Sequence, residues 1–334
     1  MNHSLLGCCA ALLLIGFGLF WHKPAHATIS CSNVSMTSVA FGNVNPLSSQ
    51  TDSTATLSYK CSNNDILNSY SATICFSIGE PAGGPTNPRV MHDAANDALN
   101  FQLYQNASRS IIWGSQFFGS NTPLVVNITL PPASVLGGPS SMTGTATMYG
   151  RVLGGQTTAV PNAGYKDQYQ NGDTAMTISQ TTGTTAPGSC SGTTTGSYFP
   201  FLVSATVVSN CFVSASPLNF GNSVGLLTSV VTATTSLGVQ CSYNTAYNVG
   251  LDGGQNSGGN INARKMLLGA NSIGYQLYQN SARSTVWGNT IGSNTVSGTG
   301  NGNTQSLTVY GQVPAQTTPP AGTYNDTITV TVTY

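Results

Sequence analysis

The chain has 334 residues, only 5% of them charged, and its nine Lys and Arg residues balance its nine Asp and Glu residues. This composition offers no basic patch for nucleic acid and no polybasic run for anionic lipid. Gly, Ser, Thr and Asn are abundant between short strand-like runs, which is typical of an all-β extracellular protein, and the length suits two domains.

The first 27 residues have the pattern of a secretory signal peptide. An apolar run extends from Leu5 to Trp21, and Ala25-His26-Ala27 follows it as a small-x-small cleavage site. Cys8 gives only a superficial resemblance to a lipoprotein signal, because cleavage there would leave no apolar core before it. We therefore expect residues 1–27 to be removed and the mature chain, starting at Thr28, to be exported.

Six cysteines remain after the signal segment: Cys31, Cys61, Cys75, Cys190, Cys211 and Cys241. An even number of cysteines in an exported protein indicates disulfide bonds. Metal binding is not expected, because no spacing is C-x-x-C and the only mature histidine is His92. Asp93 and Asp97 share a predicted loop with His92, and we interpret this loop as a solvated turn.

The sequence repeats itself. Cys31 and Cys61 are 30 residues apart, and so are Cys211 and Cys241. Further blocks recur in the same order: 41–43 as 220–222, 89–91 as 264–266, 101–110 as 275–284, 113–114 as 287–288 and 148–150 as 309–311. Such ordered matches indicate two copies of one domain. We predict an N-terminal domain at residues 28–208 and a C-terminal domain at residues 209–334.

Each copy consists of short strand-like runs separated by Gly, Asn and Ser turns, which predicts a β-sandwich. The Cys31–Cys61 and Cys211–Cys241 pairs would each join an early strand to a later one. Cys75 and Cys190 have no counterpart in the second copy, so we expect them to pair with each other in the first domain.

The last stretch of the sequence predicts a half-buried strand. Its apolar residues alternate with threonines and are Ile328, Val330, Val332 and Tyr334. The sequence ends there, so we expect no further strand of this chain to pair with it. A sandwich needs a partner or a blunting device at each edge, and these four residues therefore predict the edge of an unfilled groove.

The first copy carries longer loops than the second. From Trp113 to Tyr149 there are 36 residues, whereas from Trp287 to Tyr310 there are 23. The inserted loops contain apolar residues, namely Phe117, Phe118, Val135, Leu136, Val160 and Tyr165. They either fold back onto the sandwich or form an exposed contact surface, and the sequence leaves both readings open.

Other features are interpreted as structural. Arg109 and Trp113 recur as Arg283 and Trp287, and residues shared by a plain and an elaborated copy are more often structural than ligand-binding. An enzyme is not expected, because a hydrolase needs a nucleophile with a base or a pair of carboxylates. His92 stands alone, and the mature carboxylates are scattered along the sequence.

The paired cysteines, the FGN turn, the R-x-M and LYQN-x-x-R-S-x-x-WG motifs and the final AGTY-x-D-T-x-T-V-T-V-T-Y resemble the spore coat protein U-like domain family. The second copy matches along nearly its whole length, and the first matches in blocks separated by insertions. Most exported bacterial members resemble pilins of archaic chaperone–usher pili, and a two-domain member of this size is similar to a Csu-type tip adhesin.

This resemblance implies two immunoglobulin-like β-sandwiches, of which the C-terminal one is an incomplete pilin sandwich lacking its last strand. In the family the gap is filled first by a periplasmic chaperone and then by the N-terminal extension of a neighbouring subunit. Here only Thr28, Ile29 and Ser30 precede Cys31 after the predicted cleavage, too few for a strand of typical length. We expect a subunit that accepts a strand and donates none, at the pilus tip.

The expected function is adhesion to surfaces and biofilm formation through the apolar loops, on a pilus exported through the periplasm to the cell surface. The expected partners are a periplasmic chaperone, an outer-membrane usher, an adjacent subunit that donates a strand, and an abiotic or host surface. No cofactor is expected. Two alternatives stay open: a structural shaft pilin or coat subunit without a receptor role, and a glycan-binding lectin tip.

Overall fold

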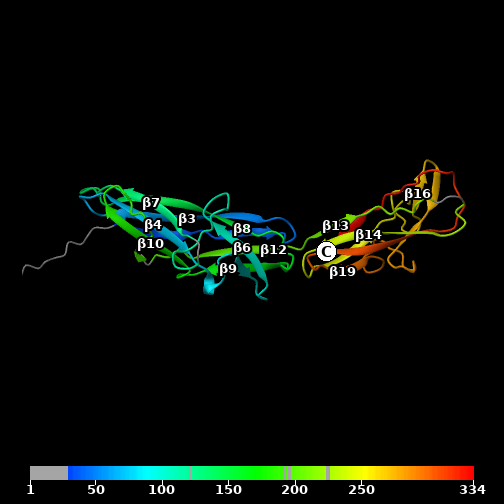
Figure 1. The fold of residues 1–334 in the computed structure, drawn as a ribbon, viewed down its shortest axis with the longest axis horizontal. Coiled ribbons are helices and arrows are strands. Elements are labelled where there is room, and N and C mark those ends of the chain that lie inside the picture. Colours follow the sequence, from blue (N-terminus) through cyan, green and yellow to red (C-terminus); the bar gives the residue numbers. More distant parts are fainter. Residues whose placement is uncertain (1–28, 120–121, 191–192, 195–196, 223–225) are drawn as a thin grey trace, which may run out of the picture.

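The computed structural model describes residues 29–119, 122–190, 193–194, 197–222 and 226–334, so the predicted signal peptide lies outside the described residues. The regular secondary structure of the described residues consists of β-strands and a short 3-10 helix at Pro81–Gly83, and this confirms the predicted all-β class. No helix among the described residues is long and apolar enough to cross a membrane. Figure 1 shows an elongated molecule in which two β-sandwiches follow one another along the long axis.

The N-terminal sandwich contains two packed sheets. In the larger sheet the strands lie in the order β1-β3-β8-β6-β5-β9-β12-β2, and in the smaller one in the order β11-β10-β4-β7. The strands are β1 Ile29–Met36, β2 Val39–Val44, β3 Thr51–Asn63, β4 Tyr70–Ile78, β5 Arg89–His92, β6 Ala98–Tyr104, β7 Leu124–Leu130, β8 Ser140–Val152, β9 Asn162–Tyr169, β10 Thr174–Thr182, β11 Thr193–Thr194 and β12 Phe201–Val207.

The C-terminal sandwich repeats this plan with shorter elements. Its sheets have the orders β13-β14-β20-β18 and β19-β15-β21, with β16 and β17 forming a separate hairpin. The strands are β13 Cys211–Ala215, β14 Val231–Cys241, β15 Ala246–Leu251, β16 Lys265–Leu268, β17 Asn271–Gly274, β18 Gln276–Tyr278, β19 Val296–Thr299, β20 Thr304–Val313 and β21 Val330–Thr333.

Each sandwich has its own hydrophobic core. The buried residues of the first core lie between Ile29 and Val207, and those of the second lie between Leu237 and Val313. Trp113 and Trp287 are fully buried at matching places, and their Nε1 atoms donate to the carbonyl oxygens of Phe76 and Val249. These contacts agree with the structural interpretation of both tryptophans.

The three disulfide bonds have the expected pairing: two follow from the repeat, and the third joins the two cysteines that have no counterpart in the second copy. Cys31–Cys61 and Cys211–Cys241 each join directly opposite residues of two neighbouring antiparallel strands. Cys75 of β4 pairs with Cys190 beyond β10, and this bond closes a span of 115 residues. Each bond lies within one sandwich, so the two sandwiches are joined through the backbone at residues 208–210.

Strand directions define the two ends of the N-terminal sandwich. The end of β3, the starts of β4 and β8 and the end of β7 gather at one end, because Asn63 is paired with Ser140 and Tyr70 is paired with Leu130. β12 runs the other way and leads into β13. We call the end away from the C-terminal sandwich the distal end (Figure 1).

Candidate functional site

Two loops meet at the distal end. They connect β3 to β4 (residues 64–69) and β7 to β8 (residues 131–139). The Ala133 N–H donates to the carbonyl oxygen of Asp65 at 2.7 Å. The Asn63 side-chain amide donates to the carbonyl oxygens of Asn68 and Pro131, each at 2.9 Å. These bonds hold the loops side by side, although they are far apart in the sequence.

Both loops expose aliphatic side chains. Leu136 is 99% exposed, Leu67 80%, Val135 78% and Ile66 53%. We call these four residues the distal apolar tip. A closed turn presents two of them, because Ser134 and Gly138 exchange backbone hydrogen bonds of 3.0 and 3.1 Å across Val135 and Leu136. Several exposed apolar side chains on neighbouring loops are characteristic of contact sites.

The sequence interpretation selected only half of this tip. It identified Val135 and Leu136 but missed Ile66 and Leu67. The signal was present, because the corresponding loop of the second copy, residues 242–245, contains no aliphatic residue. Ile66 and Leu67 could therefore have been recognised from the sequence as an apolar pair that only the first copy has in this turn.

The other four predicted surface residues lie elsewhere. Phe117 and Phe118 are 48% and 54% exposed. They lie in the loop between β6 and β7, at the end of the smaller sheet that is opposite to the distal end, and Phe118 packs there on Gly79. The prediction for Tyr165 is wrong, because this residue is 1% exposed in the core and its hydroxyl donates to the Val160 carbonyl oxygen at 2.9 Å. Val160 is half-buried beside it.

A second feature is a groove in the C-terminal sandwich. Asn325 and Leu267 of β16 exchange backbone hydrogen bonds of 2.9 and 3.2 Å. The pairing of β9 with β5 in the N-terminal sandwich, His92 with Lys166, is equivalent. There β12 lies next, between β9 and β2. Among the described residues of the C-terminal sandwich no strand takes this place, and a groove of about 360 Å³ lies there instead.

The groove has an apolar lining. Leu218, Phe220, Leu237, Tyr275, Leu277, Ile328 and Val330 contribute to its walls. Leu218 and Phe220 correspond to Val39 and Phe41, because Gly311 lies beneath the first pair as Gly150 lies beneath the second. In the N-terminal sandwich these positions are 0% and 6% exposed, whereas Leu218 and Phe220 are only partly buried.

The residues predicted to form the acceptor edge divide into two groups. Ile328 and Val330 line the groove, and Val332 packs against the core beside them. β21 pairs with β15 along one edge, and no described strand pairs with its other edge. Tyr334 lies outside the groove and is 55% exposed, with its hydroxyl donating to Asn210 Oδ1 at 3.2 Å, near the link between the sandwiches.

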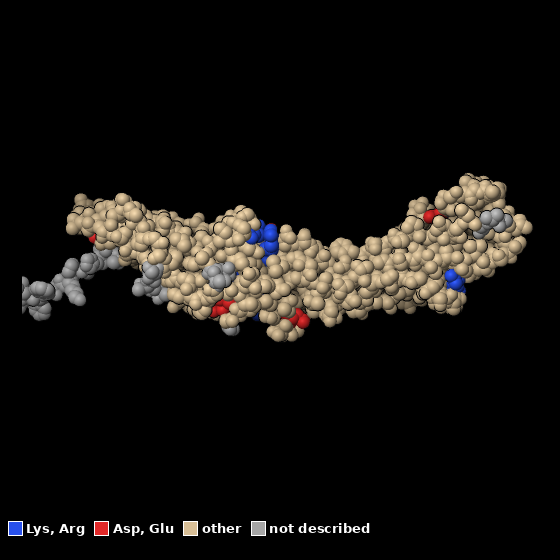
Figure 2. Space-filling view, viewed as in Figure 1, with Lys and Arg blue, Asp and Glu red and all other residues tan. Residues whose placement is uncertain are grey.

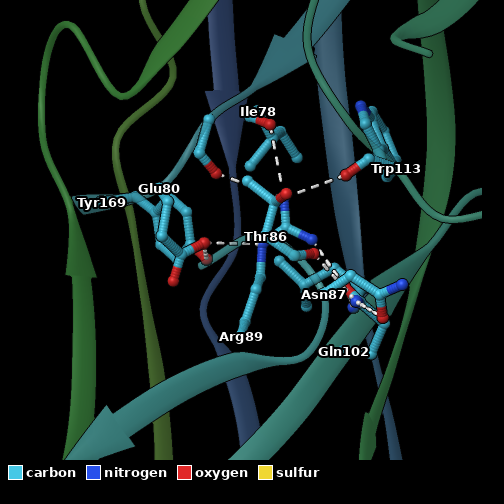
Figure 3. A network of polar contacts seen from close by, with 10 residues as sticks. Ile78, Glu80, Thr86, Asn87, Arg89, Gln102, Trp113 and Tyr169 are labelled. Atoms are coloured by element: carbon cyan, nitrogen blue, oxygen red, sulfur yellow. Dashed lines mark hydrogen bonds and ion pairs between the residues drawn. The ribbon is translucent and has the colours of Figure 1, made fainter. Parts of the chain in front are cut away.

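A buried polar network supports the interior of each sandwich. Figure 3 shows the fully buried Arg89 donating to Gln102 Oε1 at 2.6 Å and to the Trp113 carbonyl oxygen at 3.1 Å. Its Nε lies 3.0 Å from Glu80 Oε2, which also accepts the Tyr169 hydroxyl hydrogen. Burial raises the pKa of Glu80 to about 8 despite the attraction of the guanidinium group.

The C-terminal sandwich repeats the network without the glutamate. Arg264 donates to Gln276 Oε1 at 2.6 Å and to the Trp287 carbonyl oxygen at 2.8 Å, while its Nε donates to the carbonyl oxygen of Asp252. An arginine that makes the same bonds in both sandwiches serves the fold. The sequence showed it only as the repeated R-x-M motif.

Each candidate site has one carboxylate nearby: Asp65 lies in the β3–β4 loop, and Asp326 lines the groove. Figure 2 shows only a few scattered charged side chains on the visible face. No three His, Cys, Asp or Glu side chains in the described part of the chain are grouped so that they could hold a metal ion. Asp93, from the predicted solvated turn, is 8% exposed and accepts the backbone N–H groups of Ala95 and Asp97, so this turn is partly buried.

Comparison with known proteins agrees with this architecture. In the solved complex of the chaperone CsuC with CsuE, a tip adhesion subunit of archaic chaperone–usher Csu pili from Acinetobacter baumannii, the matched chain is 18% identical to this one. The match covers 91% of this chain and all of that one, with a TM-score of 0.50. At this identity the likeness shows the fold.

Two sequence matches identify the family. Protein U of Myxococcus xanthus is 35% identical over 107 residues, which is 30% of this chain and 59% of that protein, so the match spans about three fifths of the relative. The Spore Coat Protein U domain matches twice, at residues 20–171 and 197–331, and the two matches cover most of the sequence. The chain therefore belongs to the Spore Coat Protein U domain family.

Proposed function

We propose that this protein is the tip subunit of an archaic chaperone–usher pilus. In this role it attaches cells to surfaces through the distal apolar tip and contributes to biofilm formation. One observation carries the proposal: four exposed aliphatic side chains stand on two hydrogen-bonded loops at the end farthest from the C-terminal sandwich. We also propose that the sandwiches are two domains, at residues 28–208 and 209–334.

The physical basis of attachment is the removal of apolar surface from water. Burying one aliphatic side chain of this size is worth about 1.5–3 kcal/mol. A tip that buries only part of each side chain gains less, but many pili on one cell multiply a weak contact. The loops are already held by their own hydrogen bonds, so attachment costs little additional loop ordering.

The groove of the C-terminal sandwich completes the proposal. An apolar groove at the place that β12 fills in the N-terminal sandwich is suited to accept a strand from another chain. We propose that a periplasmic chaperone fills it first, by analogy with the pre-assembly complex that the chaperone CsuC forms with CsuE. An outer-membrane usher and an adjacent subunit that donates its strand would follow, and the protein would reach the cell surface at the pilus tip.

The alternatives have less support from the geometry. A shaft or coat subunit gains nothing from exposing four aliphatic side chains at a free end. A lectin would need free polar groups at the tip, whereas the Asp65 carboxylate already accepts the Leu67 N–H, the Asn68 N–H and the Asn68 side-chain amide. An apolar target is therefore the better match to the distal end.

Attachment of piliated cells to hydrophobic plastic tests the proposal. We expect the quadruple variant Ile66→Ser, Leu67→Ser, Val135→Ser and Leu136→Ser to abolish most attachment while pili keep their normal number and length. Ile111→Ser and Phe117→Ser are matched controls, because both residues are about half exposed but lie away from the tip. Equal attachment of the quadruple variant would refute an apolar tip. Loss of pili would show that these residues serve folding.

A further inference from the structure

The link between the two sandwiches shows how a strand of one unit enters another. β12 completes the N-terminal sandwich by pairing parallel to β2 and antiparallel to β9, with Val203 opposite both Val39 and Asp167. Its inward residues Phe201, Val203, Ala205 and Val207 are all buried. Only residues 208–210 separate it from β13, whose first residue is the first cysteine of the C-terminal sandwich.

The open groove has the same two borders. Residues 218–220 correspond to β2, and residues 324–328 correspond to β9, since Asn325 pairs with β16 as Lys166 pairs with β5. In this register Tyr324, Asp326 and Ile328 take the places of Tyr165, Asp167 and Tyr169. The C-terminal sandwich therefore has both neighbours of β12 but not the strand between them.

The sandwiches also touch beside the inserted strand. Gly302, with a φ of +79°, lies directly against Thr157, and a Cβ atom at Gly302 would collide with the Thr157 carbonyl group. The glycine is fixed by bonds from its N–H to the Cys241 carbonyl oxygen at 3.0 Å and from Gln240 Nε2 to its own carbonyl oxygen at 2.8 Å. This contact is part of the junction between the two sandwiches.

The segment that carries Thr157 has an equivalent in the C-terminal sandwich. The Gln156 side chain accepts the Asn100 N–H and donates to the Asn100 carbonyl oxygen. Gln316 makes the same pair of bonds with Gly274, at 2.9 Å each. Thr317 thus occupies the place of Thr157, and it is exposed where Thr157 is partly covered.

We propose that the link between the sandwiches is the template for the link to the next subunit. The partner is another domain of this family, whose donor strand lies parallel to residues 218–220, antiparallel to residues 324–328, and ends about three residues before its first cysteine. A glycine-bearing loop of the partner, equivalent to residues 300–303, rests on Thr317. This inference rests on the proposed role of the groove, and it adds the register of the donor strand and the docking contact at Thr317.

The template also predicts side-chain sizes along the donor strand. Phe201 stacks on Tyr169 with ring centroids 4.4 Å apart, and the smaller Ile328 replaces this tyrosine, so an aromatic donor residue fits there. Val203 lies beside Val39, and the larger Leu218 replaces that valine, so the next inward donor residue is valine or smaller. Matching of large and small residues conserves core volume.

The direction of the donor strand determines where the partner lies. By analogy with β12, it enters near the link at residues 208–210 and leaves at the pole that carries β16 (Figure 1). The next subunit then continues the long axis of the molecule, opposite to the distal apolar tip.

Peptide binding to the full mature chain tests the register. The probe is a labelled peptide with the sequence of residues 199–208, Phe-Pro-Phe-Leu-Val-Ser-Ala-Thr-Val-Val. We expect it to bind and to slow amide hydrogen exchange at residues 218–220 and 324–328. The control peptide exchanges neighbouring residues within 201–208, which moves Phe201, Val203 and Ala205 to the outward face, and we expect it to bind at least tenfold more weakly.

The outcomes separate the inference from the proposed function. If neither peptide binds, and if a chain with the same strand fused after Tyr334 through a Gly/Ser linker as long as residues 183–200 shows no added protection, the acceptor role of the groove fails. If the control peptide binds as well as the matched one, or if protection appears at other residues, the acceptor role stands and the register is overturned.

A substitution at Thr317 tests the proposed docking contact with the glycine-bearing loop of the partner. We expect Thr317→Arg to leave peptide binding unchanged but to reduce incorporation of the protein into pili severalfold, because the side chain would occupy the place of the partner's glycine loop. Thr308→Arg is the matched control, since Thr308 is an exposed threonine on β20 away from that contact. Normal incorporation of the Thr317→Arg protein would overturn the docking contact.

Discussion

The ring of Phe201 stacks on that of Tyr169, with centroids 4.4 Å apart and planes 5° from parallel. Phe201 begins β12, and Tyr169 ends β9, so the contact fixes the strand that completes the N-terminal sandwich. Tyr169 also donates a hydrogen bond to Glu80 in the buried network around Arg89. The contact therefore connects the strand that completes this sandwich to the buried network around Arg89.

We expect Phe201→Ala to destabilise the N-terminal sandwich by about 3–5 kcal/mol, because it removes a buried aromatic ring and leaves a cavity. Phe201→Leu should cost less, since it keeps much of the volume and loses mainly the stacking, worth about 0.5–1.5 kcal/mol. Denaturant unfolding of the mature chain measures both changes. Phe117→Ala is the control, because that ring is about half exposed. An equal effect of Phe201→Ala and Phe117→Ala would contradict the role of β12.

The buried glutamate predicts a pH dependence of stability. Burial raises the pKa of Glu80 from an ordinary 4.5 to about 8, and that of the neighbouring Asp167 to about 6. A group with a raised pKa binds its proton more tightly in the folded state, so its contribution is complete below about pH 4.5 and is lost as the pH rises toward 8. We expect the N-terminal sandwich to be less stable at pH 8 than at pH 5.

Glu80→Gln tests the cause of this pH dependence. The amide carries no charge and keeps an oxygen that can accept the Tyr169 hydroxyl hydrogen. We expect the variant to lose much of the stability difference between pH 5 and pH 8, read from hydrogen exchange in β4 and β9. Arg89, Asp167 and Tyr169 face the same site, so a weaker residual dependence from Asp167 should remain. An unchanged pH profile in the variant would contradict the role of Glu80.

The disulfide bonds should differ in what their loss costs. A bond that closes 115 residues is worth about 4–5 kcal/mol in the chain-entropy model, and one that closes 30 residues is worth about 3–4 kcal/mol. We expect the variant Cys75→Ala with Cys190→Ala to destabilise the N-terminal sandwich and leave the C-terminal one unchanged. Hydrogen exchange in β4 reports on the N-terminal sandwich, and hydrogen exchange in β15 reports on the C-terminal one. Loss of protection in β15 would show coupling between the sandwiches.

Attachment through the distal apolar tip should tolerate salt. At about 1 M salt the Debye length falls to about 3 Å, which weakens charge-driven contacts but not apolar ones. We expect attachment to neutral plastic to persist from about 0.05 to 1 M NaCl. On an anionic surface, the Leu136→Lys variant should acquire a salt-sensitive attachment that the unchanged protein lacks. A steep fall of the unchanged protein's attachment with salt would show a polar contact.

The sequence alone determined the all-β class, the two copies, the two disulfide pairs that the repeat shares and the family. These properties follow from patterns within the sequence. One is the alternation of Ile328, Val330 and Val332 with threonines, and the other is the recurrence of the 30-residue cysteine spacing. Neither requires knowledge of which distant segments meet, because alternation reports a strand and repetition reports a domain.

Only the tertiary structure decided the rest. Ile66 joins Leu136 at one tip because β3, β8, β4 and β7 pair so that their loops meet, whereas Tyr165 lies on a strand that turns its ring into the core. β12 lies beside β2, more than 150 residues earlier, and this pairing shows which strand the C-terminal sandwich lacks. Contacts between residues so far apart depend on strand order and register, which no local pattern in the sequence records.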